Sequence, residues 1–240
     1  METLPYEIIN HISTFFTNSD HRNFISINSK IHDACHDETK KKYATKKESA
    51  FFCRNGDLEM VKYCHKINLP FTTNAMDWAA KYGHLEIVKW LHENRTEGCT
   101  DDAMDCAATN GHLEMVKYLH ENRTEGCTDD AMDYAAMNGH LEVVKYLHEN
   151  RTEGCTEDAM DWAARNGHLE MVQYLHSMHS ENRTEGCTTY AMNWAAKFGH
   201  LEVVIWLYEN RTEGCTDYAM THAERSGHYH VVAYLKSITQ

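Results

Sequence analysis

The sequence predicts an all-α solenoid, a stack of short helix-turn-helix repeats, from three observations. Gly-His-Leu-Glu and its variants recur with their glycines at steps of 27, 28, 28, 28, 32 and 28 residues, which is the signature of a repeat array. Each repeat contains two segments with helical periodicity. Neither segment is long enough to be a stable helix alone, so the fold must come from stacking. The aligned glycines, which define units 1 to 7, are Gly56, Gly83, Gly111, Gly139, Gly167, Gly199 and Gly227.

The first predicted helix of a repeat is clearest in unit 4. Thr128 suits an N-cap, and Asp129 and Asp130 follow in the first turn, where negative charge meets the positive end of the helix dipole. Alanines one turn apart give this helix a face of small side chains, which lets neighbouring helices approach closely. We expect Gly139 to end the helix, because glycine adopts the left-handed conformation at little cost.

The second predicted helix of unit 4 runs from about Leu141 to Glu149. Leu141, Val144 and Leu147 form an apolar stripe, and further apolar side chains widen it. An apolar face this broad indicates that the helix packs against another helix on each side. Each unit is therefore expected to cover the next.

The repeated pattern Ala-Ala-x-x-Gly-His-Leu-Glu-x-Val-x-x-Leu resembles the ankyrin repeat, and the resemblance extends from about residue 44 to residue 240. It implies a helical solenoid whose concave face binds a partner protein. The units are shorter than the family's usual period of about 33 residues, and the missing residues belong to the hairpin between units. We therefore expect blunt loops, formed by Glu-Asn-Arg-Thr-Glu-Gly-Cys-Thr, in place of projecting β-hairpins.

Residues 4–34 do not follow the repeat and resemble an F-box, on the opening Leu4-Pro5-Tyr6-Glu7-Ile8-Ile9 and the apolar residues after it. Leu4, Ile8 and Ile12 fall on one helical face, and Pro5 suits the first turn of such a helix. The resemblance implies that Leu4, Pro5, Ile8 and Ile12 dock an adaptor of the Skp type and connect the chain to a ubiquitin ligase. The alternative interpretation is a helical cap that only covers the first repeat.

These segments predict a small F-box-like helical domain at residues 1–40 and an ankyrin array of about seven units at residues 41–240. Five lysines lie between residues 38 and 48. A solvated joint between the two modules is the commoner reason for such a run, and a nuclear-localisation signal is the other. An F-box-like head on near-identical short ankyrin units is similar to proteins of giant DNA viruses of amoebae, which implies a location in the host cytoplasm.

The formal net charge of −13 argues against a nucleic-acid partner, because phosphate binding depends on clustered lysine and arginine. If anything, this charge favours a basic partner protein. No secretory signal begins the chain, and no apolar segment approaches the length of a membrane span. We expect a cytoplasmic protein with no nucleic-acid and no membrane partner, and a monomer.

Eighteen histidines and nine cysteines raise the question of a metal site. Many recur at fixed repeat positions, and equivalent residues one unit apart cannot share an ion that needs ligands at about 2 Å. We expect the histidines after each Gly to bridge turns, those near the end of the second helix to cap it, and the repeated cysteines to be buried thiols. Acidic rows such as Asp129, Asp130 and Asp133 fit helix-start electrostatics better than catalysis, since they recur along a surface. The sequence therefore predicts no metal, no cofactor and no enzyme.

Function is expected where the units differ. The positions just before each Gly and one turn earlier vary, and the resemblance places them on the face that ankyrin proteins use for binding. Unit 6 also replaces the acidic row by Thr189, Tyr190 and Asn193. Aromatic anchors dominate interface energetics, although packing between units would also explain aromatic side chains here. The predicted partner-binding residues are Trp162, Arg165, Tyr190, Trp194, Lys197, Phe198 and Tyr218.

Two departures from the repeat concern the last units. The longest step inserts four residues around positions 177–180. This insertion predicts that the second helix of unit 5 is about one turn longer and covers Ile205. In unit 7, Glu224 replaces an alanine expected to be buried between units, which predicts the end of the array.

The leading functional hypothesis is a protein-binding module in which the array selects a target and the N-terminal segment recruits ubiquitylation machinery. The alternative is an ankyrin interaction scaffold with no link to a ubiquitin ligase.

Overall fold

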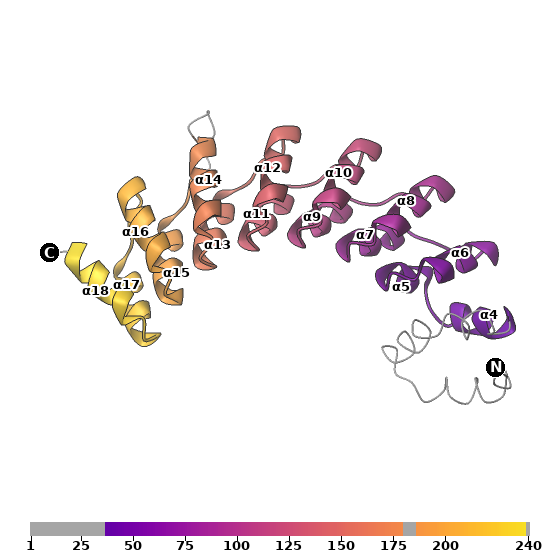
Figure 1. Ribbon diagram of the computed structural model, residues 1–240, viewed down its shortest axis with the longest axis horizontal. Coiled ribbons are helices and arrows are strands. Elements are labelled where there is room, and N and C mark those ends of the chain that lie inside the picture. Colours follow the sequence, from indigo (N-terminus) through magenta and orange to yellow (C-terminus); the bar gives the residue numbers. More distant parts are fainter. Residues whose placement is uncertain (1–36, 180–185, 239–240) are drawn as a thin grey trace, which may run out of the picture.

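In the computed structural model, which describes residues 37–179 and 186–238, the chain is an arched stack of α-helices (Figure 1). This part of the chain contains no β-strand, so its loops between units are blunt, as predicted. The all-α solenoid is confirmed. The F-box-like residues Leu4, Pro5, Ile8 and Ile12 lie outside the described residues, and the domain boundary at residue 40 stays a prediction.

Each unit contributes two helices, and a further helix, α4 (Asp37–Thr45), precedes unit 1. The first helices of units 1 to 7 are α5 (Ser49–Arg54), α7 (Asn74–Lys81), α9 (Asp102–Thr109), α11 (Asp130–Met137), α13 (Glu157–Arg165), α15 (Thr189–Phe198) and α17 (Asp217–Arg225). The second helices are α6 (Leu58–Lys66), α8 (Leu85–Asn94), α10 (Leu113–Asn122), α12 (Leu141–Asn150), α14 (Leu169–His179), α16 (Leu201–Asn210) and α18 (Tyr229–Ile238).

The helices form two rows along the arch (Figure 1). The first helices lie side by side on its inner side, and the second helices lie behind them. Side-chain size accounts for the curvature, because first helices meet through fully buried alanines such as Ala135 and Ala136. Second helices carry larger side chains and approach their neighbours less closely. The row with the smaller side chains therefore becomes the concave side, and its exposed surface is named the inner face.

The core is one apolar layer between the two rows. In unit 4 it contains Met132, Val143, Val144 and Leu147, each with at most 2% of its surface exposed. Burying an aliphatic side chain of this size contributes about 1.5–3 kcal/mol. The apolar stripe predicted for the second helix is confirmed, and it faces the first helices and the adjacent units.

The turn between the helices depends on Gly and His. Gly139 has a φ of +75°, which favours glycine. A Cβ atom on Gly139 would also lie 2.8 Å from Cε1 of His168, the turn histidine of the next unit. In the same row, His84 Nε2 lies 3.1 Å from the carbonyl oxygen of Arg54 in the preceding unit. The turn-bridging role predicted for these histidines is confirmed, because each ring covers the glycine of the unit before it.

The described part of the insertion extends the second helix of unit 5 by one residue, since α14 has 11 residues and α12 has 10. The predicted extra turn stays a prediction, because residues 180–185 lie outside the described part of the chain. Met178 turns into the core and is 6% exposed. Ile205 is half-buried, and its cover by the rest of the insertion stays a prediction because Ser180 lies outside the described residues.

Unit 7 exposes two positions that are covered in the units before it. Glu224 is exposed and forms an ion pair with Lys236 at 3.2 Å, whereas Ala136 at the same repeat position is fully buried. Tyr229, at the position of Leu141, is 73% exposed. Both side chains face solvent because, among the described residues, no further unit packs against α17 and α18.

We predict that Gly139→Ala destabilises the array more than Gly227→Ala does. Both glycines have a positive φ, +75° and +77°, and alanine in the left-handed region costs about 1–2 kcal/mol. At Gly139 the new Cβ also meets the His168 ring, whereas nothing lies within 4 Å of a Cβ at Gly227. Urea unfolding followed by circular dichroism measures both losses, and equal losses would contradict the role given to His168.

Candidate functional site

An aspartate six residues before the turn glycine bonds to the following unit in units 2 to 5. Asp133 is 3% exposed, and its carboxylate oxygens accept hydrogen bonds from Thr156 N at 2.9 Å and from Thr156 Oγ1 at 2.6 Å. Asp133 lies in the first turn of α11, as the assignment to helix-start electrostatics requires, and its carboxylate also joins two units, which was not predicted. The same hydrogen-bond pair recurs at Asp77–Thr100, Asp105–Thr128 and Asp161–Thr188.

Unit 6 keeps this connection with a neutral side chain. Asn193 Oδ1 accepts a hydrogen bond from Thr216 N at 3.1 Å, and Asn193 Nδ2 donates to Thr216 Oγ1 at 3.1 Å. Asn193 is buried and so is not available to a partner.

The predicted N-cap Thr128 is off by one residue, because α11 has Asp129 as its N-cap, although Thr128 Oγ1 accepts from Asp130 N at 3.2 Å. Threonine is the N-cap of α13, where Thr156 Oγ1 accepts from Asp158 N at 3.2 Å.

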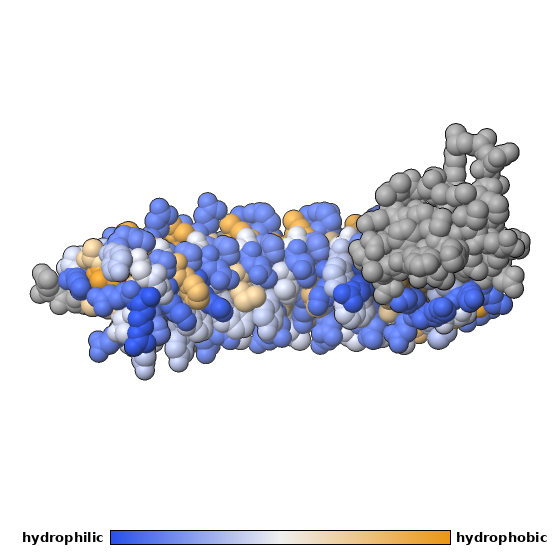
Figure 2. Space-filling model, turned by 90° about the horizontal axis from the view of Figure 1, so that it is seen from below, coloured by the Kyte–Doolittle hydropathy of each residue, from blue (hydrophilic) through white to orange (hydrophobic). Residues whose placement is uncertain are grey.

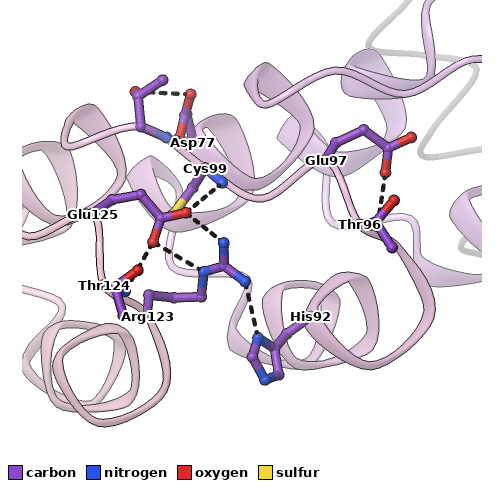
Figure 3. A network of polar contacts seen from close by, with 9 residues as sticks. Asp77, His92, Thr96, Glu97, Cys99, Arg123, Thr124 and Glu125 are labelled. Atoms are coloured by element: carbon purple, nitrogen blue, oxygen red, sulfur yellow. Dashed lines mark hydrogen bonds and ion pairs between the residues drawn. The ribbon is translucent and has the colours of Figure 1, made fainter.

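The constant loop forms a second network between units (Figure 3). Arg123 donates to both carboxylate oxygens of Glu125, and its Nη1 donates to Nδ1 of His92 in the preceding unit at 3.3 Å. Glu125 Oε1 also accepts from Cys99 N at 3.4 Å. Burial acts to raise the pKa of Glu125, but hydrogen bonds from Arg123 and from backbone N–H groups outweigh it and hold the pKa at about 2. This ion pair therefore stays charged at neutral pH and has a structural role.

The predicted capping by histidines of the second helix is wrong at His92. Its ring packs edge-on against Tyr118 of the next unit, with centroids 6.1 Å apart. Its Nδ1 accepts from Arg123, so the ring proton is on Nε2. The last carbonyls are instead bonded by asparagines, as where Asn150 Nδ2 donates to Tyr146 O at 2.8 Å.

The expectation that the repeated cysteines are all buried is wrong for three of them, because Cys99 and Cys187 are buried while Cys127, Cys155 and Cys215 are only half-buried. Burial raises the pKa of Cys99 and of Cys127 to about 12, so both stay protonated at neutral pH. The cysteines of the described residues are all free. In the same part of the chain, no group of three or more His, Cys, Asp or Glu side chains is arranged to hold a metal ion. Nor is any helix described there long and apolar enough to cross a membrane.

The side chains exposed on the inner face differ from unit to unit. Half-buried aromatic residues occupy one position on most first helices, and one pair of neighbours in this row stacks. Tyr134 and Trp162 have ring centroids 5.2 Å apart. Figure 2, which looks at the molecule from below, shows pale and orange residues scattered among hydrophilic ones. Packing between units therefore accounts for part of the aromatic row, and the exposed edges can contact a partner.

The predicted partner-binding residues at the border of units 5 and 6 meet in one cluster. Tyr190 stacks on Trp194 with centroids 5.1 Å apart. The Arg165 guanidinium lies 5.8 Å from the centroid of the Trp194 ring and 5.4 Å from that of Phe198, and Lys197 Nζ lies 5.4 Å from that of Phe198. Tyr190 is 56% exposed and Phe198 41% exposed. These five residues are named the unit-6 cluster.

The other two predicted residues lie beside this cluster. Trp162 stacks on Tyr134, and Tyr218, which is 66% exposed, stacks on His222 with centroids 5.7 Å apart. Among the described residues, no ring contact joins Trp162 or Tyr218 to the cluster. The seven predicted residues therefore form three neighbouring groups along the inner face.

A second cluster of the same composition lies at units 1 and 2, where the sequence analysis selects no binding residue. The Arg54 guanidinium lies 4.9 Å from the Trp78 ring centroid and 5.4 Å from that of Tyr82, and the two rings stack 6.1 Å apart. Lys81 Nζ lies 5.6 Å from the Trp78 ring centroid. The signal is present in the sequence, because Arg54 holds the repeat position of Arg165. These four residues are named the unit-2 cluster.

Helix pairs that stack through constant side chains and expose variable ones on one face define a helical repeat solenoid, a class that offers an extended binding surface. A family model described as Ankyrin repeats (3 copies) matches residues 49–130, 78–161, 104–185 and 160–239. These matches cover most of the chain, which therefore belongs to the ankyrin-repeat family and is a protein–protein interaction module. A search of curated proteins found no match.

We predict that the buried aspartate row makes the array less stable as the pH rises through mild acid. Burial raises the pKa of Asp133 from its ordinary value of 3.8 to about 6. The unfolded carboxyl group ionises first, so the contribution of protonated Asp133 is complete below about pH 4 and is lost as the pH rises to about 6. The loss is on the order of 1–3 kcal/mol.

Asp133→Asn should remove this loss, because Asn193 makes both hydrogen bonds to threonine without a charge. Urea unfolding at about pH 4 and about pH 7 compares the variant with the wild type, and the variant should gain relative stability at the higher pH. The exposed Asp130→Asn is the matched control and should keep the wild-type pH dependence. An Asp133→Asn effect that is the same at both pH values would disprove this titration.

Proposed function

We propose that the array binds a partner protein along its inner face and that the unit-6 cluster is the main contact. The observation that carries this proposal is the stack of exposed Tyr190 on Trp194 beside exposed Phe198. Aromatic and arginine side chains supply most of the binding energy at protein interfaces, and stacked rings lose little conformational freedom on binding. Trp162 and Tyr218 extend the surface on either side.

The outer row of helices is a poorer candidate. Its lysines pair with glutamates of the same helix, as in Lys145 Nζ to Glu142 Oε1 at 2.7 Å, and the pair recurs in several units. A surface that repeats in units 1 to 4 cannot select one register among these units. The exposed residues of the inner face differ between units, so this face can specify both the partner and its position.

We predict that Trp194→Ala combined with Phe198→Ala reduces capture of partner proteins by about tenfold or more. Both rings leave the inner face in this variant, while the Asn193–Thr216 bonds that hold the unit remain. Affinity capture from cell extract with quantitative mass spectrometry measures the loss. Tyr208→Ala is the control, because Tyr208 is an equally exposed aromatic residue of the same unit on the outer helix α16, at 47%. Equal capture by the double variant and by Tyr208→Ala would exclude the unit-6 cluster.

The proposed link to ubiquitylation rests on the N-terminal sequence. On this proposal Leu4, Pro5, Ile8 and Ile12 dock a Skp-type adaptor, and the array holds the target. An ankyrin scaffold without this link is the second candidate, in which the N-terminal segment only covers the first repeat.

We predict that Leu4→Asp combined with Ile8→Asp abolishes binding of a purified Skp-type adaptor in a pull-down, because two charges replace the apolar face that docks it. The Trp194→Ala, Phe198→Ala variant is the control and should retain the adaptor. Failure of the intact chain to bind the adaptor would favour the scaffold.

A further inference from the structure

The cations of the two inner-face clusters differ from the salt-bridged lysines and arginines of the array in the groups that they contact. A glutamate of the same unit pairs with four lysines of the second helices and with four arginines of the constant loops, namely Lys62, Lys89, Lys117, Lys145, Arg95, Arg123, Arg151 and Arg211. Within residues 37–179 and 186–238, none of the cluster cations forms a salt bridge; they lie against aromatic rings instead. These cations are Arg54, Lys81, Arg165 and Lys197.

Units 2 and 6, which carry the lysines and the aromatic rings of the two clusters, also lack the acidic pair that begins the first helix in the units between them. Units 3, 4 and 5 have Asp101-Asp102, Asp129-Asp130 and Glu157-Asp158 there. Unit 2 has Thr73-Asn74 and unit 6 has Thr189-Tyr190. Three changes therefore occur together at two places in the chain. They are an arginine without a salt bridge in the preceding unit, a lysine followed by an aromatic residue before the Gly, and a first helix that begins without acidic residues. Packing alone does not require this coincidence.

The chemistry of each cluster suits a carboxylate next to an apolar side chain. A guanidinium stacked on a ring keeps its N–H groups free at its edges, where they can donate to both oxygens of a carboxylate. Lys197 lies against the same Phe198 ring as Arg165, so two positive charges flank one exposed apolar surface. The stacking also holds the arginine in place before binding, which lowers the entropy lost on association.

We propose that the two clusters are paired sites for acidic segments of one partner protein, each segment presenting carboxylates beside an apolar side chain. This inference rests on the proposed function of the inner face and adds the chemistry of the ligand. It reverses the expectation from the net charge of −13, which favours a basic partner. The reason is that a ligand meets the local charge of the cluster first, and distant charges are screened over about 10 Å.

A nucleic acid is a poorer occupant, although it is also anionic. A phosphate backbone that reaches both clusters would pass units 3 and 4, where the exposed Asp101, Asp102, Asp129 and Asp130 repel it. A protein segment can instead place neutral or basic residues there. Four repeat steps of about 8–10 Å separate the clusters, which is roughly 30–40 Å. About 12 extended residues, at about 3.3 Å each, cover this distance.

The first experiment selects peptides from a displayed library of random 12-residue sequences on the intact chain. Peptides that also bind the Arg165→Glu, Lys197→Glu double variant are removed by counter-selection. The expected result is enrichment of Asp or Glu beside an apolar residue. Enrichment of basic or neutral sequences, or no difference between the chain and the variant, would overturn the acidic specificity. Some peptides could fail to bind the Trp194→Ala, Phe198→Ala variant and still bind the charge variant. That result would support the proposed function of the unit-6 cluster and would contradict only the inference that its ligand is acidic.

The second experiment measures the affinity of the most enriched peptide by fluorescence anisotropy. The chain used for this measurement carries Arg54→Gln, so that the peptide binds at the unit-6 cluster alone. In this chain Arg165→Gln, which removes the charge and keeps a long side chain, should weaken binding about tenfold, and added salt should weaken it further. Lys117→Gln is the control, because Lys117 pairs with Glu114 on the outer helix α10; it should leave the affinity unchanged. Unchanged thermal melting of Arg165→Gln shows that the loss is not one of folding. Equal affinities for the two variants would refute the role of Arg165.

The pairing of the sites is tested with two copies of this peptide joined by a flexible linker of about 15 residues. The joined peptide should bind at least about tenfold tighter than the single one, because the second contact becomes intramolecular. Arg54→Gln should remove this gain while leaving the single peptide at the unit-6 cluster unaffected. No gain in the intact chain would show that the clusters do not act together.

Discussion

A buried aspartate that holds the threonine at the start of the next unit sets the register of the whole array. Asp133 accepts both the backbone N–H and the hydroxyl of Thr156, and the threonine hydroxyl in turn caps its own helix. One side chain thus determines where the next helix begins and how it lies against the one before. Because the bond repeats from unit to unit, small differences in the loops do not accumulate along the stack, and unit 5 absorbs its insertion with the Asp161–Thr188 bond intact.

The other constant residues also hold neighbouring units together. The turn histidines cover the glycines of the preceding unit, and the loop arginines reach back to the histidines of its second helix. Small alanines bring the first helices close while larger side chains separate the second helices, so the arch and its inner face follow from the packing. Residues free of these duties are few, and they are the ones that differ between units. The constant positions therefore hold the stack together, and the variable positions are left for the proposed binding of a partner.

Much of this could be predicted from the sequence because the pattern is repeated. The bounds of α11 and α12, the left-handed Gly139 and the bridging turn histidines follow from local rules that apply to each unit. The role of Asp133 could not be predicted, because nothing in the sequence distinguishes it from Asp129 and Asp130. Only Asp133 is buried, against a threonine that lies 23 residues later in the chain. The division of the seven predicted binding residues into groups also depends on which rings meet across units.

By itself, the sequence determined that this chain stacks short helix pairs into an ankyrin-type array and that its units differ at few positions, because periodicity and turn chemistry act over less than one repeat. Only the tertiary structure decided which acidic residues are buried, that His92 meets Arg123 in place of a helix end, and that Arg54 and Arg165 lie on aromatic rings of the following unit. The physical reason is that each of these contacts joins residues about one repeat apart, and their geometry exists only once neighbouring units have packed.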